Sequence, residues 1–251
     1  MHKGNSHLEI DATGMHYRDL NTQMREAVAK GTERIDVHNV CGQRYLGTDL
    51  HRPVEIHIHG TPGNDLAAFM DGPLITVRGN AQDGCGNTMN DGQVIIHGRA
   101  GDATGHAMRG GKIFIRDDAG YRVAIHMKEY EDKRPIIVIG GTAQHFLGEY
   151  MAGGVLVVLG LTLRPGAQHV ANYIGTGMHG GVMYLRGELA DYQLGREVGR
   201  VPLEDADNLL LRQLVEEFSV HFGHDAETIL SHTFTKVRPL SSRPYGRLYA
   251  Y

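Results

Sequence analysis

The segment RAGDATGHAMRGGKIFIRD, residues 99–117, carries the main clue to the architecture, because it repeats the pattern of the nineteen residues before it, NAQDGCGNTMNDGQVIIHG, residues 80–98. In both segments a glycine is followed by a methionine, then by a Gly-Gly or Asp-Gly pair and a short aliphatic run. The shared core, G-x-x-M-x-[G/D]-G, recurs at Gly86, Gly105, Gly148 and Gly175. A short fixed period predicts a solenoid, in which each unit buries its apolar side against its neighbours.

The repeating unit is a β-strand rather than a helix. Runs such as VIIHG (94–98) and KIFIR (112–116) are short and strand-like, and the 34 glycines of the 251-residue chain are too dense for helices. The period of nineteen is no multiple of six or nine, which argues against the hexapeptide and calcium-binding nonapeptide coils. We therefore predict an all-β solenoid, a parallel β-helix with one coil per repeat and coils about 4.8 Å apart.

Two aliphatic columns are predicted to fill the interior of this β-helix, because side chains two residues apart on a strand share a face. The columns are Ile56, Ile75, Val94, Ile113, Ile137, Leu156 and Met183, and, two residues further on, Ile58, Val77, Ile96, Ile115, Ile139, Val158 and Leu185. A flexible thioether suits an irregular core, so we expect the methionines at the nineteen-residue step to be buried as well: Met70, Met89, Met108 and Met127.

The outward column between the two aliphatic columns is more apolar than a solvated face should be. It contains His57, Thr76, Ile95, Phe114, Val138, Val157 and Tyr184, of which five are large and apolar. We expect this outward ribbon to be covered, either by the C-terminal segment of the chain itself or by a partner subunit. If a partner covers it, the interface residues are Ile95, Phe114, Val138, Val157 and Tyr184.

The next outward column is basic and is predicted to form the solvated edge of the same sheet. It contains His59, Arg78, His97 and Arg116. The pair His57 and His59 on one strand face also raises the hypothesis of a metal site, but the sequence offers no third or fourth ligand. The sequence therefore nominates no metal ligand.

Helices are predicted on both sides of the repeats. Residues 17–31 form an amphipathic pattern ending at Gly31, residues 203–223 carry a dense apolar stripe, and 225–234 read as a shorter helix. The remaining stretch, 235–251, resembles a docking tail more than a folded element. These patterns divide the chain into an N-terminal arm and helix (1–35), the β-helix (36–190), and a C-terminal helical cap with a docking tail (191–251).

Composition narrows the function classes. A formal net charge of −4 gives no reason to expect nucleic acid as a partner. We find no signal peptide and no apolar run long enough to span a membrane, so we expect a cytoplasmic protein. Cys41 and Cys85 match no metal or redox spacing and read as two reduced thiols.

Two motifs suggest chemistry, and each also has a structural explanation. The segment GCGNTM (84–89) begins like a dinucleotide-binding fingerprint, but Met89 stands where the third glycine belongs. Asp83 and Asp102 are nineteen residues apart, so they fall on adjacent coils. They could act on a glycoside or bind calcium, or they could satisfy backbone amides as turn residues. We predict no catalytic, cofactor-binding or metal-binding residue.

The repeats resemble those of the GXGXG domain at the C-terminus of the glutamate synthase large subunit. The segments NVCGQRYLGTDL (39–50) and VEIHIHGTPGNDLAAF (54–69) are similar to the entry into that domain, and LRQLVEEF (211–218) with HDAETILSHTFTKVRP (224–239) resembles the exit. The resemblance covers residues 36–239. One of the subunits of formylmethanofuran dehydrogenase shares the repeats, but the flanking segments favour glutamate synthase.

The resemblance implies a right-handed parallel β-helix without catalytic residues or cofactors of its own. It implies a separate subunit of a split, archaeal-type glutamate synthase. Such a subunit would hold the glutamine amidotransferase subunit and the FMN/iron–sulfur synthase subunit together, so that glutamine and 2-oxoglutarate yield glutamate. Two alternatives remain: a scaffold of the formylmethanofuran dehydrogenase type, and a self-standing carbohydrate-active β-helix that uses Asp83 and Asp102.

Overall fold

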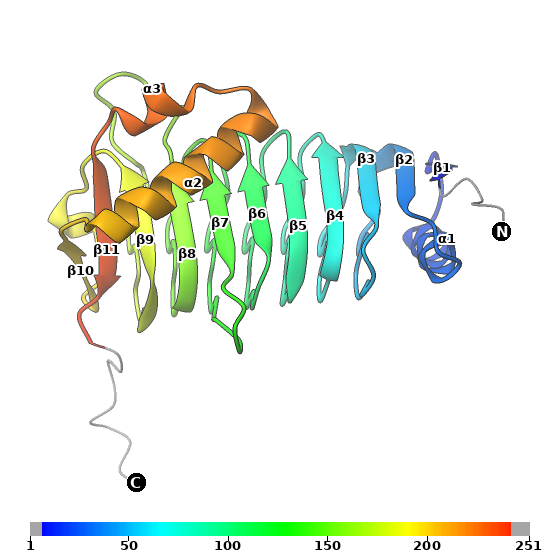
Figure 1. Ribbon diagram of the computed structural model, residues 1–251, viewed down its shortest axis with the longest axis horizontal. Coiled ribbons are helices and arrows are strands. Elements are labelled where there is room, and N and C mark those ends of the chain that lie inside the picture. Colours follow the sequence, from blue (N-terminus) through cyan, green and yellow to red (C-terminus); the bar gives the residue numbers. More distant parts are fainter. Residues whose placement is uncertain (1–6, 242–251) are drawn as a thin grey trace, which may run out of the picture.

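The repeats fold as stacked coils in the computed structural model, which describes residues 7–241 (Figure 1). The elements, in chain order, are β1 (His7–Asp11), α1 (Tyr17–Ala29), β2 (Arg34–Cys41), β3 (Glu55–Thr61), β4 (Asp71–Arg78), β5 (Asp91–Ile96), β6 (Lys112–Ile115), β7 (Ile136–Ile139), β8 (Ala152–Val158), β9 (Gly180–Arg186), the 3-10 helix η1 (Asp191–Gln193), β10 (Val198–Val201), α2 (Asp205–Phe222), α3 (Ala226–Leu230) and β11 (Phe234–Pro239). The strands form one sheet in the order β1 to β9, then β11 and β10. The predicted all-β solenoid is confirmed.

The register of the sheet follows the sequence period. Ile56 pairs in parallel with Ile75, Ile75 with Val94, and Val94 with Ile113. The charged segment 128–135 interrupts the nineteen-residue period between β6 and β7. The same column continues beyond it through the pairs of β6 with β7, β7 with β8 and β8 with β9. Both predicted inward columns and the four methionines at the nineteen-residue step are buried, none more than 1% exposed. The interior predicted from the alternation is therefore confirmed.

The insertion KEYEDKRP, residues 128–135, lengthens one coil without breaking the sheet. Ile115 still pairs with Ile139, twenty-four residues further on. The extra residues form a tight turn in which the backbones of Tyr130 and Lys133 exchange hydrogen bonds of 3.2 and 3.0 Å. The Nζ atom of Lys133 lies 2.9 Å from a carboxylate oxygen of Asp71, which ties the turn back to β4.

The turn side of each coil uses an unusual backbone. In the coil that contains residues 103–107, Ala103, Gly105 and Ala107 all have positive φ, at 52°, 72° and 50°. The cost of this conformation for alanine is on the order of 1 kcal/mol. The three amides donate alternately to the following and the preceding coil, with bonds of 2.7 to 2.9 Å. Inter-coil hydrogen bonds therefore offset the backbone strain.

The two ends of the solenoid differ. At the first end, α1 packs Leu20 and Met24 into the core of the rod. At the other end, β11 runs antiparallel between β9 and β10. The prediction that residues 235–251 form an unfolded docking tail is wrong for residues 235–239, which belong to β11. The rest of the predicted tail, from residue 242 onward, lies outside the described residues.

Helix α2 crosses the outer face of the sheet rather than the end of the rod (Figure 1). Its apolar side forms a second core with the outward ribbon, separate from the interior of the solenoid. The apolar stripe seen in the sequence is therefore directed at the strands. This second core brings the C-terminal segment, β6 to β9 and four of the five predicted interface residues together: Phe114, Val138, Val157 and Tyr184.

Candidate functional site

The outward ribbon is the first candidate surface, and α2 covers it from β6 to β9. Phe114, Val138 and Val157 are fully buried, Tyr184 is 1% exposed and Ile95 is 6% exposed. The first four pack in the second core with residues of α2: Leu211, Leu214, Val215 and Phe218. The sequence left two possibilities for the cover, the C-terminal segment of the chain or a partner subunit. The structure shows the C-terminal segment. The ribbon does not offer these five side chains to a partner, and this corrects their assignment as interface residues.

A buried polar network fixes the first turn of α2 to the sheet. The Tyr184 hydroxyl donates to Asp207 at 2.5 Å, and Lys236 of β11 donates to the same carboxylate at 2.6 Å. Burial alone would raise the pKa of Asp207, but the hydrogen bonds from Lys236, Tyr184 and the Glu204 amide outweigh it and lower this pKa. Burial and the Asp207 partner raise the pKa of Tyr184. The network is a structural anchor in which each group has a partner.

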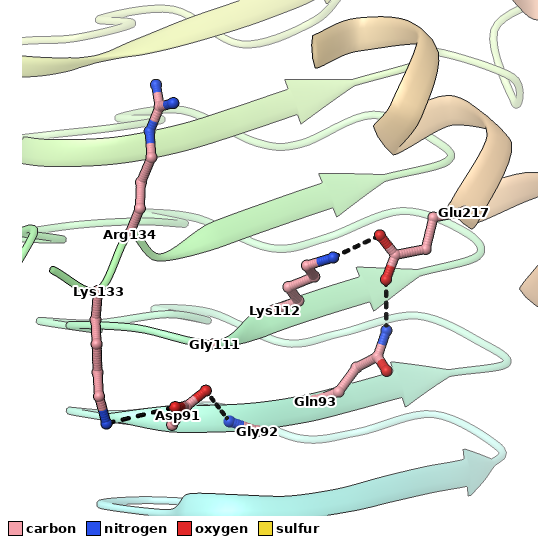
Figure 2. A pocket seen from close by; sticks show the side chains of 8 residues that line it. All are labelled: Asp91, Gly92, Gln93, Gly111, Lys112, Lys133, Arg134 and Glu217. Carbon is pink, nitrogen blue, oxygen red and sulfur yellow. Dashed lines mark hydrogen bonds and ion pairs between the residues drawn. The ribbon is translucent and has the colours of Figure 1, made fainter.

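A pocket lies beside α2 where β5 and β6 begin (Figure 2). It has a volume of 360 Å³, and glycine backbone at Gly92 and Gly111 forms part of its lining. Lys112 bonds to Glu217 at 2.6 Å, and Gln93 donates to the same carboxylate at 3.1 Å. Polar contacts to Glu217 therefore connect the sheet to the second half of α2 at this pocket.

The other charges around this pocket are paired as well. Lys133 lies 3.4 Å from Asp91, and Arg134 lies 3.3 Å from Glu129. Figure 2 shows Lys133 directed at Asp91 while Arg134 extends the other way. The pairs around this pocket therefore hold the insertion and the helix in place.

Asp83 and Asp102 are used by the backbone. The Asp83 carboxylate accepts from the Asp102 amide at 2.8 Å, and the Asp102 carboxylate accepts from the Tyr121 amide at 2.8 Å. Asn80 serves the Arg99 amide in the same way, at 2.8 Å. Each of these side chains accepts a hydrogen bond from a backbone amide of the following coil. This is the structural role in turns that the sequence analysis considered for Asp83 and Asp102.

The histidine pair does not assemble a metal centre. His57 and His59 lie 3.7 Å from Glu55 and Asp36 respectively, and the His59 ring stacks on His38 at 4.6 Å. Within residues 7–241 no group of three or more His, Cys, Asp or Glu side chains is arranged to hold a metal ion. In the structure the two histidines contact carboxylates and a neighbouring imidazole ring, that of His38.

A second surface, which the sequence analysis missed, lies on the turn side of the later coils. We call it the aromatic surface; it consists of Tyr121, His126, His145, Phe146, Tyr150 and Tyr173. Phe146 stacks on Tyr173 with ring centres 4.9 Å apart, and His126 stacks on Tyr150 at 5.2 Å. Tyr150 is 41% exposed and Tyr173 is 55% exposed. Aligning the turn residues of successive repeats, and not only the strands, would have paired these rings: Tyr121 with His145, Phe146 with Tyr173, and His126 with Tyr150.

One charged pair lies within the aromatic surface. The Arg122 guanidinium lies 4.9 Å from the centre of the Phe146 ring and bonds to Glu149 at 3.0 Å. Tyrosine, phenylalanine and arginine are enriched where proteins bind one another, whereas lysine is depleted there. The aromatic surface therefore has the composition of a protein–protein interface.

The fold and these surfaces define a β-solenoid whose described polar clusters are structural and whose exposed rings are available to other molecules. The chain belongs to the GXGXG motif family, whose model matches residues 19–240. It is also similar to an uncharacterized protein of Methanocaldococcus jannaschii, with 46% identity over 255 residues and 98% of each chain covered. Among the helices of residues 7–241, none is long and apolar enough to cross a membrane.

Proposed function

We propose that this chain is the non-catalytic scaffold subunit of a split glutamate synthase. Its partners would be a glutamine amidotransferase subunit, which releases ammonia from glutamine, and a synthase subunit, which adds it to 2-oxoglutarate. The observation that carries the proposal is the aromatic surface, in which exposed, stacked rings lie on the turn side of the rod. Membership in the GXGXG family supports the connection to glutamate synthase.

The cofactors of the reaction belong to the partner in this proposal. An iron–sulfur cluster requires four ligands, usually cysteine thiolates, whereas this chain has two cysteines, Cys41 exposed and Cys85 buried. Burial raises the pKa of Cys85 to about 12, so its thiol remains protonated. The residues of this chain therefore do not fit a cluster, and FMN and the iron–sulfur clusters are assigned to the synthase subunit. We place the complex in the cytoplasm.

Purification of the tagged chain from its native host tests the proposal. We expect the chain to retain an amidotransferase subunit and a flavin- and iron–sulfur-containing subunit, and we expect the complex to form glutamate from glutamine and 2-oxoglutarate. A chain that purifies alone contradicts the proposal. A complex with a pterin-containing dehydrogenase contradicts it as well and points to the formylmethanofuran dehydrogenase type.

A pair of variants connects the test to the aromatic surface. Tyr150→Asp with Tyr173→Asp places charges among exposed rings, so we expect the rod to fold and the partners to be lost. Val220→Asp is the control, because Val220 is 83% exposed on α2 and lies outside the aromatic surface. Circular dichroism and thermal unfolding establish that each variant is folded. Equal recovery of both partners with the double variant would show that the aromatic surface is not the docking site.

A further inference from the structure

Part of the outer face of the sheet is not covered by α2. The helix ends beside β5 and β6, where the ring of Phe222 lies 5.1 Å from that of His97 and His221 bonds to Gln93 at 3.1 Å. Strands β2, β3 and β4 extend beyond the helix toward the first end of the rod (Figure 1). The uncovered area therefore begins at the last turn of α2.

The basic column crosses the boundary of this area at the ends of the strands. His59 pairs in register with Arg78, and the following pairs of β4 with β5 and β5 with β6 place His97 and Arg116 next in line. Neighbouring strands are about 4.8 Å apart. Four basic residues on four successive coils therefore form one row on the surface.

The row is not neutralised evenly. His59 has Asp36 at 3.7 Å, and Arg116 has Asp117 at 3.0 Å. Within the described chain, Arg78 has no carboxylate within 4.0 Å; its guanidinium contacts the His97 ring at 2.9 Å instead. Burial, followed by the charges of Arg78 and Arg116, lowers the pKa of His97. The uncompensated positive charge of the row is therefore that of Arg78.

The Arg78 guanidinium is a positive charge without a carboxylate beside it, and a bound carboxylate would compensate it. The arginine fork is suited to two parallel hydrogen bonds with a carboxylate. Arg78 is exposed and has no such partner among the described residues. We infer that Arg78, His97 and Arg116 form a docking surface for an acidic segment of a partner protein. This inference rests on the proposed function, because it supposes that the rod holds partner subunits.

A protein partner fits these observations better than nucleic acid does. The chain as a whole is acidic, with 29 Asp and Glu residues against 25 Lys and Arg. The row is also short, whereas typical DNA-binding proteins make about 6–10 phosphate contacts. A short acidic segment matches the length and the charge of the row.

A labelled deca-glutamate peptide, titrated into the full chain and followed by fluorescence anisotropy, tests the surface. We expect salt-dependent binding that weakens about fivefold in the double variant Arg78→Gln with Arg116→Gln, because two exposed ion pairs are lost. The matched control is Arg25→Gln with Arg164→Gln, which removes the same charge from two exposed arginines away from the row. A short DNA duplex serves as the second probe.

The outcomes separate this inference from the proposed function. Equal peptide binding by both double variants overturns the docking surface, and DNA binding that depends on Arg78 and Arg116 replaces it with a nucleic-acid surface. Recovery of partner subunits from the host measures the proposed function separately. Recovered partners that are unaffected by Arg78→Gln with Arg116→Gln leave the scaffold intact and overturn this surface. Peptide binding without any glutamate synthase partner supports the surface and contradicts the scaffold.

Discussion

Truncation of Phe218 tests whether α2 is held to the rod by the second core. Phe218 is fully buried, and its ring lies so close to the sheet that a Cβ on Gly140 would be 2.5 Å from it. Replacing a buried phenylalanine by alanine costs about 3–5 kcal/mol. Since each 1.4 kcal/mol is a factor of ten, we expect amides in the middle of α2 to exchange with solvent about 100 to 4,000 times faster in Phe218→Ala.

Hydrogen exchange followed by mass spectrometry measures this effect element by element. The interior of the solenoid is a separate core, so β3 to β5 should keep their protection while α2 loses it. Val220→Ala is the control on the same helix, because Val220 is 83% exposed, and it should change exchange less than about threefold. Unchanged protection of α2 in Phe218→Ala, or an equal loss along the whole rod, would refute the assignment of α2 to a separate second core.

Three further predictions concern single side chains. Asp102→Ala should lower the free energy of unfolding by about 1–2 kcal/mol because it frees the Tyr121 amide, whereas Asp102→Asn, which keeps an acceptor, should cost much less; chemical denaturation compares them. The hydrogen bonds from Arg34 hold the pKa of Asp36 well below its usual range. The stability that this carboxylate contributes is therefore present above about pH 4, the ordinary pKa of an aspartate, and is lost progressively as the pH falls below it. The free energy of unfolding, measured at a series of pH values below about 4, should therefore depend less steeply on pH in Asp36→Asn than in the unsubstituted chain. An equal pH dependence of the two proteins would refute this. With a thiol reagent at about pH 8, near the ordinary pKa of a thiol, Cys41 should react in the folded protein and buried Cys85 only after unfolding; rapid reaction of both would contradict its burial.

The interior of the solenoid could be predicted because it depends on local repetition. The alternation in VIIHG and KIFIR, together with the nineteen-residue step, places Val94 above Ile113 without any knowledge of distant contacts. The outward ribbon could be predicted to be covered for the same reason. The identity of the cover could not, because an apolar stripe such as that of residues 203–223 fits the outer face of the sheet and a partner equally well.

Strand β11 illustrates what local pattern cannot supply. Its sequence FTKVRP contains a lysine and a proline, which are typical of exposed segments. In the structure Lys236 is buried to 4% exposure because Asp207, twenty-nine residues earlier, accepts its hydrogen bond. The aromatic surface was missed for a related reason, since rings such as Phe146 and Tyr173 become neighbours only after coils of unequal length are stacked.

The position of α2 determines where this rod can meet other proteins. The helix removes the most apolar part of the sheet from the surface, so a partner of the proposed scaffold cannot use Phe114, Val138 or Val157 without displacing α2. Displacement would also break the contacts of Asp207 with Tyr184 and Lys236 and of Glu217 with Lys112. Removing one member of a buried pair such as Asp207–Lys236 costs several kcal/mol. Binding is therefore cheaper on surfaces that leave the helix in place, and the aromatic surface and the basic column both do so.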